Sequence, residues 1–203
     1  MKSPLLSLLK FSVAMIVTAI YFLTSCNEKS PAEPSSKDEI YEVVNAVLQP
    51  FDTVPEAADS DKYILSDRLD EVKRYPGDSL GIHFYSDMFT KEDIAYIFKQ
   101  ANDTTAISLA GHIRVKKARL VSADSIAKIF DSPKLEVSWE NFYKKYGHGF
   151  TSVSKPVFSV DHKTALITIA YHGGSLSGGG TLYILRKEKS GWVVKSGRMR
   201  WIS

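Results

Sequence analysis

The chain has 203 residues, of which 26 are basic, 23 are acidic and 44% are hydrophobic, and its net charge is +3. Because the basic residues form no clustered excess, the charge pattern excludes the electrostatic footprint of a nucleic-acid-binding protein. Cys26 is the single cysteine. No disulfide can therefore form within the chain, and a domain of this size must rely on its hydrophobic core.

Residues 1–26 have the pattern of an export signal. Lys2 and Lys10 are the only charged residues before Cys26, and residues 11–23 are almost wholly apolar. A basic region followed by an apolar run is typical of a signal peptide, and this run is shorter than the ~20 residues of a membrane-spanning helix. The alternative is an uncleaved helix over residues 5–24, which would place Lys10 in the bilayer at a cost of about 3 kcal/mol.

The run ends in Leu23-Thr24-Ser25-Cys26, which resembles the lipobox of bacterial lipoproteins. The resemblance implies that residues 1–25 are removed, and that Cys26 receives a diacylglycerol and an acyl chain such as palmitate. These chains would anchor the protein stably to a membrane of the cell envelope. Asn27 follows the cysteine. By resemblance to enterobacterial sorting, a residue other than Asp there implies the outer membrane, on its periplasmic or surface face.

Residues 26–37 contain no large apolar side chain and are expected to form an extended, solvated tether. We therefore divide the chain into a signal peptide (1–25), a lipid attachment site with its tether (26–37) and a single α+β domain (38–203). Within that domain, a helical lobe over residues 38–150 and a sheet over residues 151–203 are possible.

Apolar residues at helical spacing predict helices in the first part of the domain. Residues 40–48 place five aliphatic side chains on one face, and Pro50 is expected to end this helix. Thr90 is expected to cap another helix, because Asp93 stands at the capping-box distance. The other elements predicted before residue 150 are a helix over 61–73, strands over 80–85 and 113–121, and two helices capped by Ser122 and Ser138, the second ended by Gly147.

From residue 153 the period of the apolar residues changes from helical to two. Four strands are predicted, over residues 153–159, 165–172, 182–187 and 192–201. Because the links between them are short, neighbouring strands should be antiparallel. The predicted fold class is α+β, with N-terminal helices packed on a C-terminal four-stranded antiparallel meander sheet.

Four segments of the C-terminal third carry a second resemblance. They are SKPVFS (154–159), ALI (165–167), GGGTLYIL (178–185) and GWVV (191–194). They resemble a group of uncharacterised bacterial proteins, many of them lipoproteins, that share a Gly-rich hairpin and a Gly-x-Trp-x-Val last strand. The resemblance covers residues 139–203 and implies no activity. Some members have two cysteines in the hairpin, where this chain has Gly173 and Ser177, so no disulfide or metal site is implied there.

The Gly-rich segment over residues 173–180 is the most unusual feature. It is not a phosphate-binding P-loop, because Thr181 begins a strand instead of a helix. It also lacks the Gly-x-Ser-x-Gly pattern of a nucleophile elbow. We expect a hairpin loop with bulges, whose glycines supply positive φ or close backbone approach. The alternative is a site for a peptide or glycan edge, formed by His172, Gly173, Gly174, Ser175, Ser177 and Gly179.

The five histidines are scattered, with no pair at the i, i+4 spacing of a helical zinc motif. We therefore predict no metal site and no cofactor. His172 ends a strand beside the Gly-rich segment, and His148 lies in a flexible connector from which it can approach that segment. His162 is expected to be solvated in a turn.

On the last strand Arg198 and Arg200 alternate with Met199 and Trp201, so both arginines should face solvent.

The function we favour is non-enzymatic, with no catalytic residues. In this reading the domain is tethered to the envelope membrane through Cys26 and binds a protein or glycan partner. The first alternative is a hydrolase that uses His172 or His148 near the Gly-rich loop with a nearby serine or carboxylate. The second is a purely structural envelope component.

Overall fold

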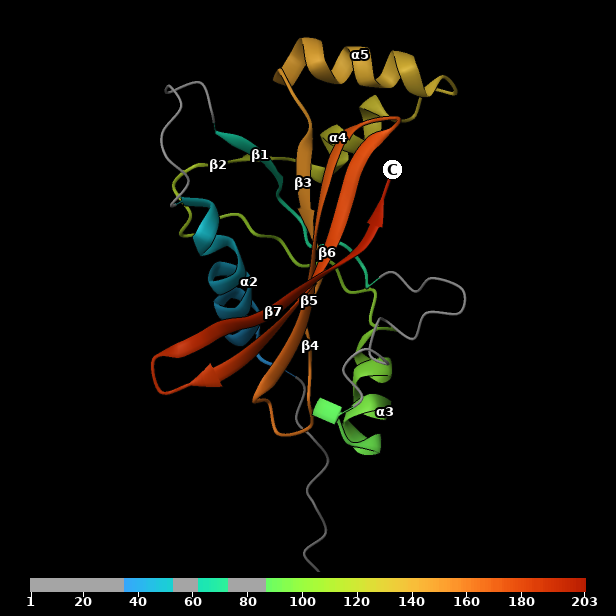
Figure 1. Ribbon diagram of the computed structural model, residues 1–203. Coiled ribbons are helices and arrows are strands. Elements are labelled where there is room, and N and C mark those ends of the chain that lie inside the picture. Colours follow the sequence, from blue (N-terminus) through green and yellow to red (C-terminus); the bar gives the residue numbers. More distant parts are fainter. Residues whose placement is uncertain (1–34, 53–61, 73–86) are drawn as a thin grey trace, which may run out of the picture. The chain divides into compact units, whose positions relative to one another are not determined.

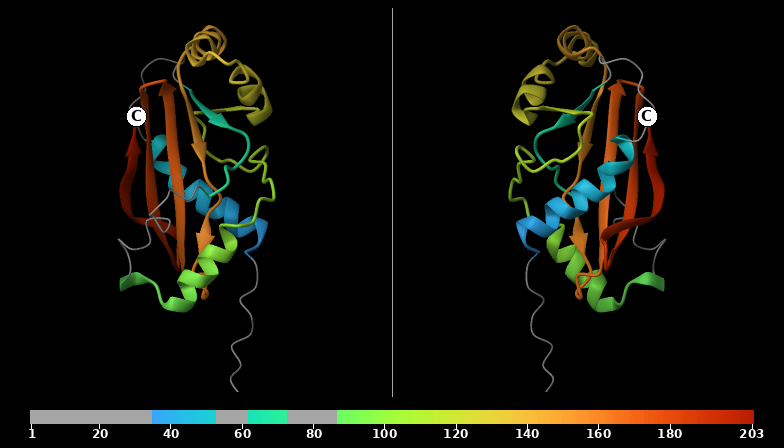
Figure 2. Two further views of the ribbon diagram at one scale, coloured as in Figure 1. Left: turned by 90° about the vertical axis from the view of Figure 1, so that its right-hand side faces the viewer. Right: turned by 90° about the vertical axis from the view of Figure 1, so that its left-hand side faces the viewer.

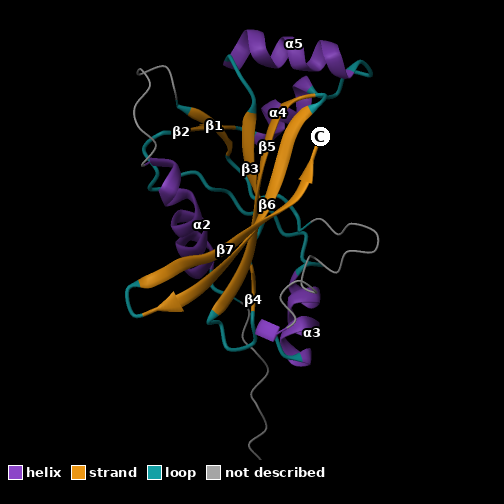
Figure 3. Ribbon diagram, viewed as in Figure 1, coloured by secondary structure: helices purple, strands orange, loops and turns teal. Residues whose placement is uncertain are grey.

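The computed structural model describes residues 35–52, 62–72 and 87–203, which all lie in one compact unit from Pro34 to Ser203. The fold is mixed α+β (Figures 1 and 3). The described elements are helices α2 (Lys37–Asp52), α3 (Lys91–Gln100), α4 (Ala123–Ile129) and α5 (Leu135–Tyr146), and strands β1 (Tyr63–Ser66), β2 (Ala118–Val121), β3 (Phe150–Val153), β4 (Val157–Phe158), β5 (Thr164–Gly174), β6 (Ser177–Glu188) and β7 (Gly191–Ile202). None of the helices in these ranges is long and apolar enough to span a bilayer.

The sheet is larger than the predicted four-stranded meander. Within the described residues it has seven strands in the order β2-β1-β3-β5-β6-β7, and β4 also pairs with β5. The C-terminal strands pair antiparallel, as predicted. However, β1 pairs in parallel with both β2 and β3. Because β1 and β2 come from residues 38–150, this region is not a separate helical lobe.

The helix predicted over residues 61–73 is wrong, since Tyr63–Ser66 forms β1 inside the sheet. Ile64 and Leu65 are buried there, at 1% and 0% exposure. A run of four residues is too short for its period to separate strand from helix. Pairing with β2 and β3, which are distant in sequence, makes this segment a strand. The strand predicted over residues 80–85 lies outside the described residues.

The strand predicted over residues 113–121 is reduced to β2, which begins only at Ala118. Side chains of α2 bind the preceding backbone N–H groups in place of a neighbouring strand. Asn45 Oδ1 accepts from Arg114 N at 2.7 Å. Asp52 accepts from the backbone N–H groups of Lys116 and Lys117, at 3.1 and 3.0 Å. Asp52 is also the last residue of α2, which continues two residues past the predicted stop at Pro50.

Helix ends follow local chemistry in some places and tertiary contacts in others. The capping box of Thr90 and Asp93 on α3 is confirmed, and Gly147 ends α5 at a φ of 92°. Ser138 does not cap α5, which begins one turn earlier and buries this residue completely. Ser122 precedes α4 but makes no side-chain cap; Asp67 Oδ1 accepts from Ala123 N instead.

Three apolar clusters hold the helices to the two faces of the sheet. On one face α2 packs against Ile167 and Ile169 of β5, among others. On the opposite face α3 packs at one end, over Leu166, while α4 and α5 pack at the other end, beside Phe150 (Figure 2). Between these two ends lie residues of β5 that belong to none of the clusters, namely Thr168, Ala170 and His172. This stretch of the face positions the candidate site.

The predicted loop over residues 173–180 is mostly strand. β5 continues to Gly174 and β6 begins at Ser177, so only two residues form the turn. The predicted bulge is present, between His172 and Gly174. The close approach expected of the glycines is also found. A Cβ at Gly180 would collide with the indole of Trp201, whose Cε2 would lie 2.7 Å away.

Candidate functional site

A pocket lies on the sheet face between the end covered by α3 and the end covered by α4 and α5. Its accessible volume is about 40 Å³ and it opens to solvent. Register places Ser152, Ala170, Gly180 and Trp201 in one row across β3, β5, β6 and β7. The first three side chains are small and leave a hollow above the sheet. The indole of Trp201, which lies over Gly180, forms one wall.

His172 and Ser152 form a hydrogen-bonded pair in this pocket. Ser152 Oγ lies 3.1 Å from His172 Nε2, on neighbouring strands. The imidazole stacks on Phe150 with ring centroids 4.7 Å apart, and its centroid lies 5.9 Å from that of Trp201. Because Phe150 packs against the α4–α5 cluster, the position of the imidazole depends on that end of the domain.

A second serine in the pocket has a structural role. Ser154 follows the end of β3, where the chain departs from the ladder before β4. Its hydroxyl accepts from Thr168 N at 2.9 Å and donates to Lys155 O at 3.0 Å. The hydroxyl thus replaces a backbone acceptor in the pairing with β5.

Charged residues of both signs line the pocket. Asp70 and Glu71 follow β1. Asp70 N donates to Val153 O at 2.8 Å, and its carbonyl accepts from Lys155 N at 2.9 Å, so this segment lies alongside the end of β3. Arg200 of β7 lines the pocket as well.

Arg200 and Trp201 both line the pocket although they are consecutive residues. Side chains of a regular strand point to alternate faces. In β7, however, Trp201 pairs with Gly180 while Met199 pairs with Thr181, so Arg200 is the extra residue of a bulge. The prediction that Arg200 faces solvent assumed a regular strand and is wrong for this reason. Arg198 is exposed, as predicted.

Of the six residues predicted to form a binding site, only His172 lines the pocket. Gly173 and Gly174 end β5, Ser175 is exposed in the turn, and Ser177 and Gly179 lie in β6. His148 is exposed just before β3 and does not line the pocket either. Sequence reasoning missed Asp70, Glu71, Ser152, Ser154, Thr168, Ala170, Arg200 and Trp201.

One signal for the missed residues was present in the sequence. Thr168, Ala170 and His172 alternate with Ile167 and Ile169, which marks one face of β5 as less apolar. Across the residues that the structure describes, no group of three or more His, Cys, Asp or Glu side chains is placed to hold a metal ion.

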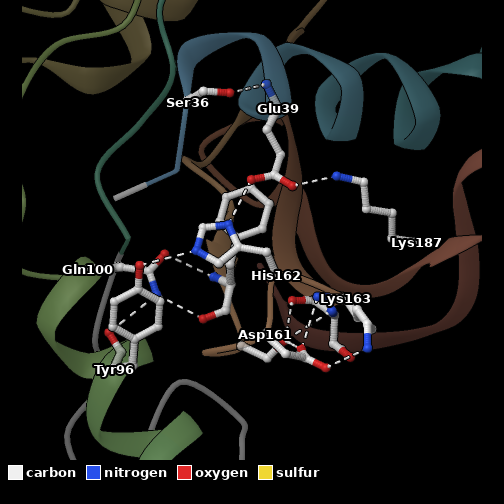
Figure 4. Close-up of polar contacts among 11 residues, drawn as sticks. Ser36, Glu39, Tyr96, Gln100, Asp161, His162, Lys163 and Lys187 are labelled. Carbon is white, nitrogen blue, oxygen red and sulfur yellow. Dashed lines mark hydrogen bonds and ion pairs between the residues drawn. The ribbon is translucent and has the colours of Figure 1, made fainter. Parts of the chain in front are cut away.

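A second polar cluster surrounds His162, which was expected to be solvated but is only 22% exposed (Figure 4). Its Nδ1 donates to Glu39 Oε2 at 2.8 Å, and the hydroxyl of Tyr96 lies 3.3 Å from its Nε2. Lys187 Nζ donates to Glu39 Oε1 at 2.9 Å. The cluster joins the first turn of α2 to α3, β6 and the turn before β5. These contacts assign it a role in stability.

The carboxyl group of Glu39 has a pKa below its ordinary value. Burial raises this pKa, but hydrogen bonds from His162 and Lys187, together with the positive charge of Lys187, outweigh burial and lower it. A carboxyl whose pKa is lower in the folded state contributes stability above its unfolded pKa. That contribution is lost as the pH falls through the folded pKa.

We therefore expect Glu39→Gln to lower the free energy of unfolding by about 1–2 kcal/mol at pH 7, because it removes charge-assisted hydrogen bonds. The difference from wild type should shrink as the pH falls below the ordinary pKa of a glutamate, because the unfolded chain takes up a proton there, whereas the folded carboxyl, whose pKa is lower, takes it up only at still lower pH. Urea unfolding of both proteins at pH values from 7 to 3 measures this difference in the free energy of unfolding. Glu42→Gln, on the exposed side of the same helix, is the matched control and should change little. An equal loss at every pH would show that the charge of Glu39 is not what stabilises the fold.

A comparison of the chain with known proteins finds no matching family model, no matching curated protein and no matching solved structure. The function is therefore argued from the site and from the residues that precede the domain.

Proposed function

We propose that this chain is an envelope lipoprotein, anchored through Cys26, whose domain binds a protein or glycan partner without converting it chemically. The pocket around His172 is the binding site in this proposal. The observation that carries it is the convergence of polar side chains from β3, β5, β7 and the segment after β1 on a stretch of sheet outside the three apolar clusters. A concave site with an aromatic wall and a few placed polar groups is typical of ligand binding.

A hydrolase is the second candidate, and the Ser152–His172 hydrogen bond favours it, because a serine nucleophile needs an adjacent base. Two features make the hydrolase hypothesis weaker than the binding hypothesis. Ser152 is only 3% exposed, and it lies within a regular stretch of β3 instead of on the sharp turn that presents a nucleophilic serine. A purely structural component would have no need for a polar pocket, so that reading comes third.

The proposal is tested in cells that express tagged wild type, Cys26→Ser or His172→Ala and are fed an alkyne fatty acid. We expect Cys26→Ser to lose all fatty-acid label and its membrane attachment, because the only thiol is gone. We expect His172→Ala to keep the label. The amount of envelope material cross-linked to this variant should be at least tenfold lower than the amount cross-linked to wild type.

His148→Ala is the matched control for binding, since His148 is exposed outside the pocket. Equal labelling of wild type and Cys26→Ser would refute the anchor. Equal recovery by wild type and His172→Ala would refute the pocket. Material recovered cleaved from wild type but intact from Ser152→Ala would replace binding by hydrolysis.

A further inference from the structure

A second pocket lies on the face of the sheet that α2 covers, opposite the face of His172. It is formed where α2 runs beside β6 and β7 (Figure 1), and it reaches the turn between these two strands. Its accessible volume is about 480 Å³, whereas the pocket around His172 has about 40 Å³. Pockets that hold small molecules typically have ~300–1,000 Å³. This second pocket, which we call the α2 groove, therefore has room for a ligand.

One wall of the α2 groove is fixed by hydrogen bonds from buried or half-buried side chains. Asn45 Nδ2 donates to His112 O at 2.9 Å, and Asn45 Oδ1 accepts from Arg114 N at 2.7 Å. Asp52 accepts from the next backbone N–H groups, those of residues 116 and 117. These bonds hold the segment before β2 against α2. The groove is therefore formed before a ligand binds, which lowers the entropy cost of binding.

The side chains that line the α2 groove offer both donors and acceptors. Glu42 brings only acceptors and Arg114 only donors, while Gln49 and Ser190 bring both. Across the described ranges, no hydrogen bond or ion pair occupies the side chains of these four residues. All four are exposed, so they can bind a ligand without giving up a contact within the protein.

Trp192 lies in the floor of the α2 groove with one unusual feature. The residue is only 7% exposed, and its indole N–H has no hydrogen-bond partner in the part of the chain that the structure describes. A buried indole N–H usually has a partner. Beside it, Val115 adds apolar surface to the lining. The groove thus combines exposed polar groups with an apolar floor that contains an unpaired donor.

We infer that the α2 groove binds a neutral saccharide, as a second ligand site in addition to the pocket around His172. Each hydroxyl group of a sugar both donates and accepts a hydrogen bond, so a lining of mixed donors and acceptors satisfies several of them at once. The apolar floor receives the C–H groups of the sugar ring. A hydroxyl oxygen at the floor supplies the acceptor that the Trp192 indole lacks.

Other classes of ligand fit this lining less well. An anion would meet the carboxylates of Glu42 and Asp52, and a cation would meet the guanidinium of Arg114. An apolar molecule would cover these polar groups and remove their water without replacing its hydrogen bonds. Unfavourable contacts with the wrong ligand contribute to specificity as much as favourable ones with the right ligand.

The test is a calorimetric titration of the full chain in a polyoxyethylene detergent, which carries no sugar headgroup. The probes are two matched pairs of disaccharides. Cellobiose is paired with its uronic acid, which is an anion, and N,N′-diacetylchitobiose is paired with deacetylated chitobiose, which is a cation. We expect at least one neutral disaccharide to bind, and its charged counterpart to bind at least fivefold more weakly.

Variants of the lining assign the binding to the α2 groove. Gln49→Ala and Arg114→Gln should each weaken binding of the neutral disaccharide at least fivefold, because each removes a hydrogen bond. Both positions are exposed, so the melting temperature should not change. Arg186→Gln, at an exposed position outside the groove, is the matched control and should bind as wild type does.

Trp192→Phe tests the unpaired donor, because it keeps an aromatic ring and removes the N–H group. A purely structural role of Trp192 predicts that a folded Trp192→Phe protein binds the disaccharide as wild type does. We expect binding to be at least fivefold weaker instead. If this variant does not fold, the two exposed variants decide the question alone.

The inference is overturned if neither neutral disaccharide binds, if the charged counterparts bind equally well, or if Gln49→Ala and Arg114→Gln bind as wild type does. His172→Ala separates this site from the proposed function. We expect it to bind the disaccharide normally. If it abolishes that binding while the groove variants retain it, the saccharide occupies the pocket around His172, so the α2 groove is refuted and the proposed function stands.

Discussion

Gly149→Ala is expected to lower the free energy of unfolding by about 3 kcal/mol, the upper part of the range for overpacked sites. Gly149 is buried immediately before β3, where the chain passes the end of β5. A Cβ there would collide with His172 O, and would lie 2.7 Å from Gly173 Cα and 2.9 Å from His172 C. All three atoms are backbone, so no side-chain rotation relieves the contact. The two strands would have to separate.

Gly179→Ala is the matched control, because a Cβ at Gly179 meets nothing closer than Trp201 O at 3.4 Å. We expect this variant to be neutral or slightly stabilising, since alanine restricts the unfolded chain more than glycine does. Thermal and urea unfolding of the two variants measure the difference. Equal stability of Gly149→Ala and Gly179→Ala would mean that the approach of β3 to β5 is not as tight as the structure places it.

Phe142→Ala is expected to lower the free energy of unfolding by about 3–5 kcal/mol, the usual range for removing a buried aromatic ring. Phe142 is 0% exposed and attaches α5 to the sheet. Its ring centroid lies 5.3 Å from that of Phe150, 5.8 Å from Trp139 and 4.8 Å from Tyr146. The cavity would therefore open inside an aromatic cluster that has few ways to collapse.

The same substitution should also affect ligand binding in the pocket around His172. The ring of Phe150 packs at a tilt against Phe142 and stacks on His172, so we expect Phe142→Ala to weaken ligand binding as well as stability. Val137→Ala, at a 40% exposed position of the same helix, should change stability by less than about 0.5 kcal/mol. Urea unfolding separates the two variants, and a Phe142→Ala protein as stable as Val137→Ala would contradict the packing of α5 on β3.

The sequence predicted those elements whose cause is local. The capping box of Thr90 and Asp93, the helix end at Gly147 and the apolar face of residues 40–48 each depend on residues within a few positions of one another. The antiparallel pairing of β5, β6 and β7 depends on short turns and an alternating period. Such signals are present in any window of about ten residues, whatever the rest of the chain does.

Most residues of the candidate site could not be predicted from the sequence, because they are brought together by pairing between distant segments. Asp70 reaches the pocket because the segment after β1 pairs beside β3, far along the chain. Arg200 reaches it through a bulge, and one extra residue reverses the face that a regular strand predicts. His162 is only partly exposed and its ring is hydrogen-bonded to Glu39, which lies 123 positions earlier.

The sequence by itself thus determined the α+β class and the antiparallel pairing of the last three strands, and it singled out His172, which lines the pocket. It also carries the pattern from which the lipid anchor at Cys26 is proposed. Only the tertiary structure decided that residues 63–66 form a strand, that the glycines receive the indole of Trp201, and that charges of opposite sign line one pocket. The physical reason is that helix caps and turns are local equilibria, whereas register, bulges and parallel pairing are set by contacts between segments that the chain brings together only on folding.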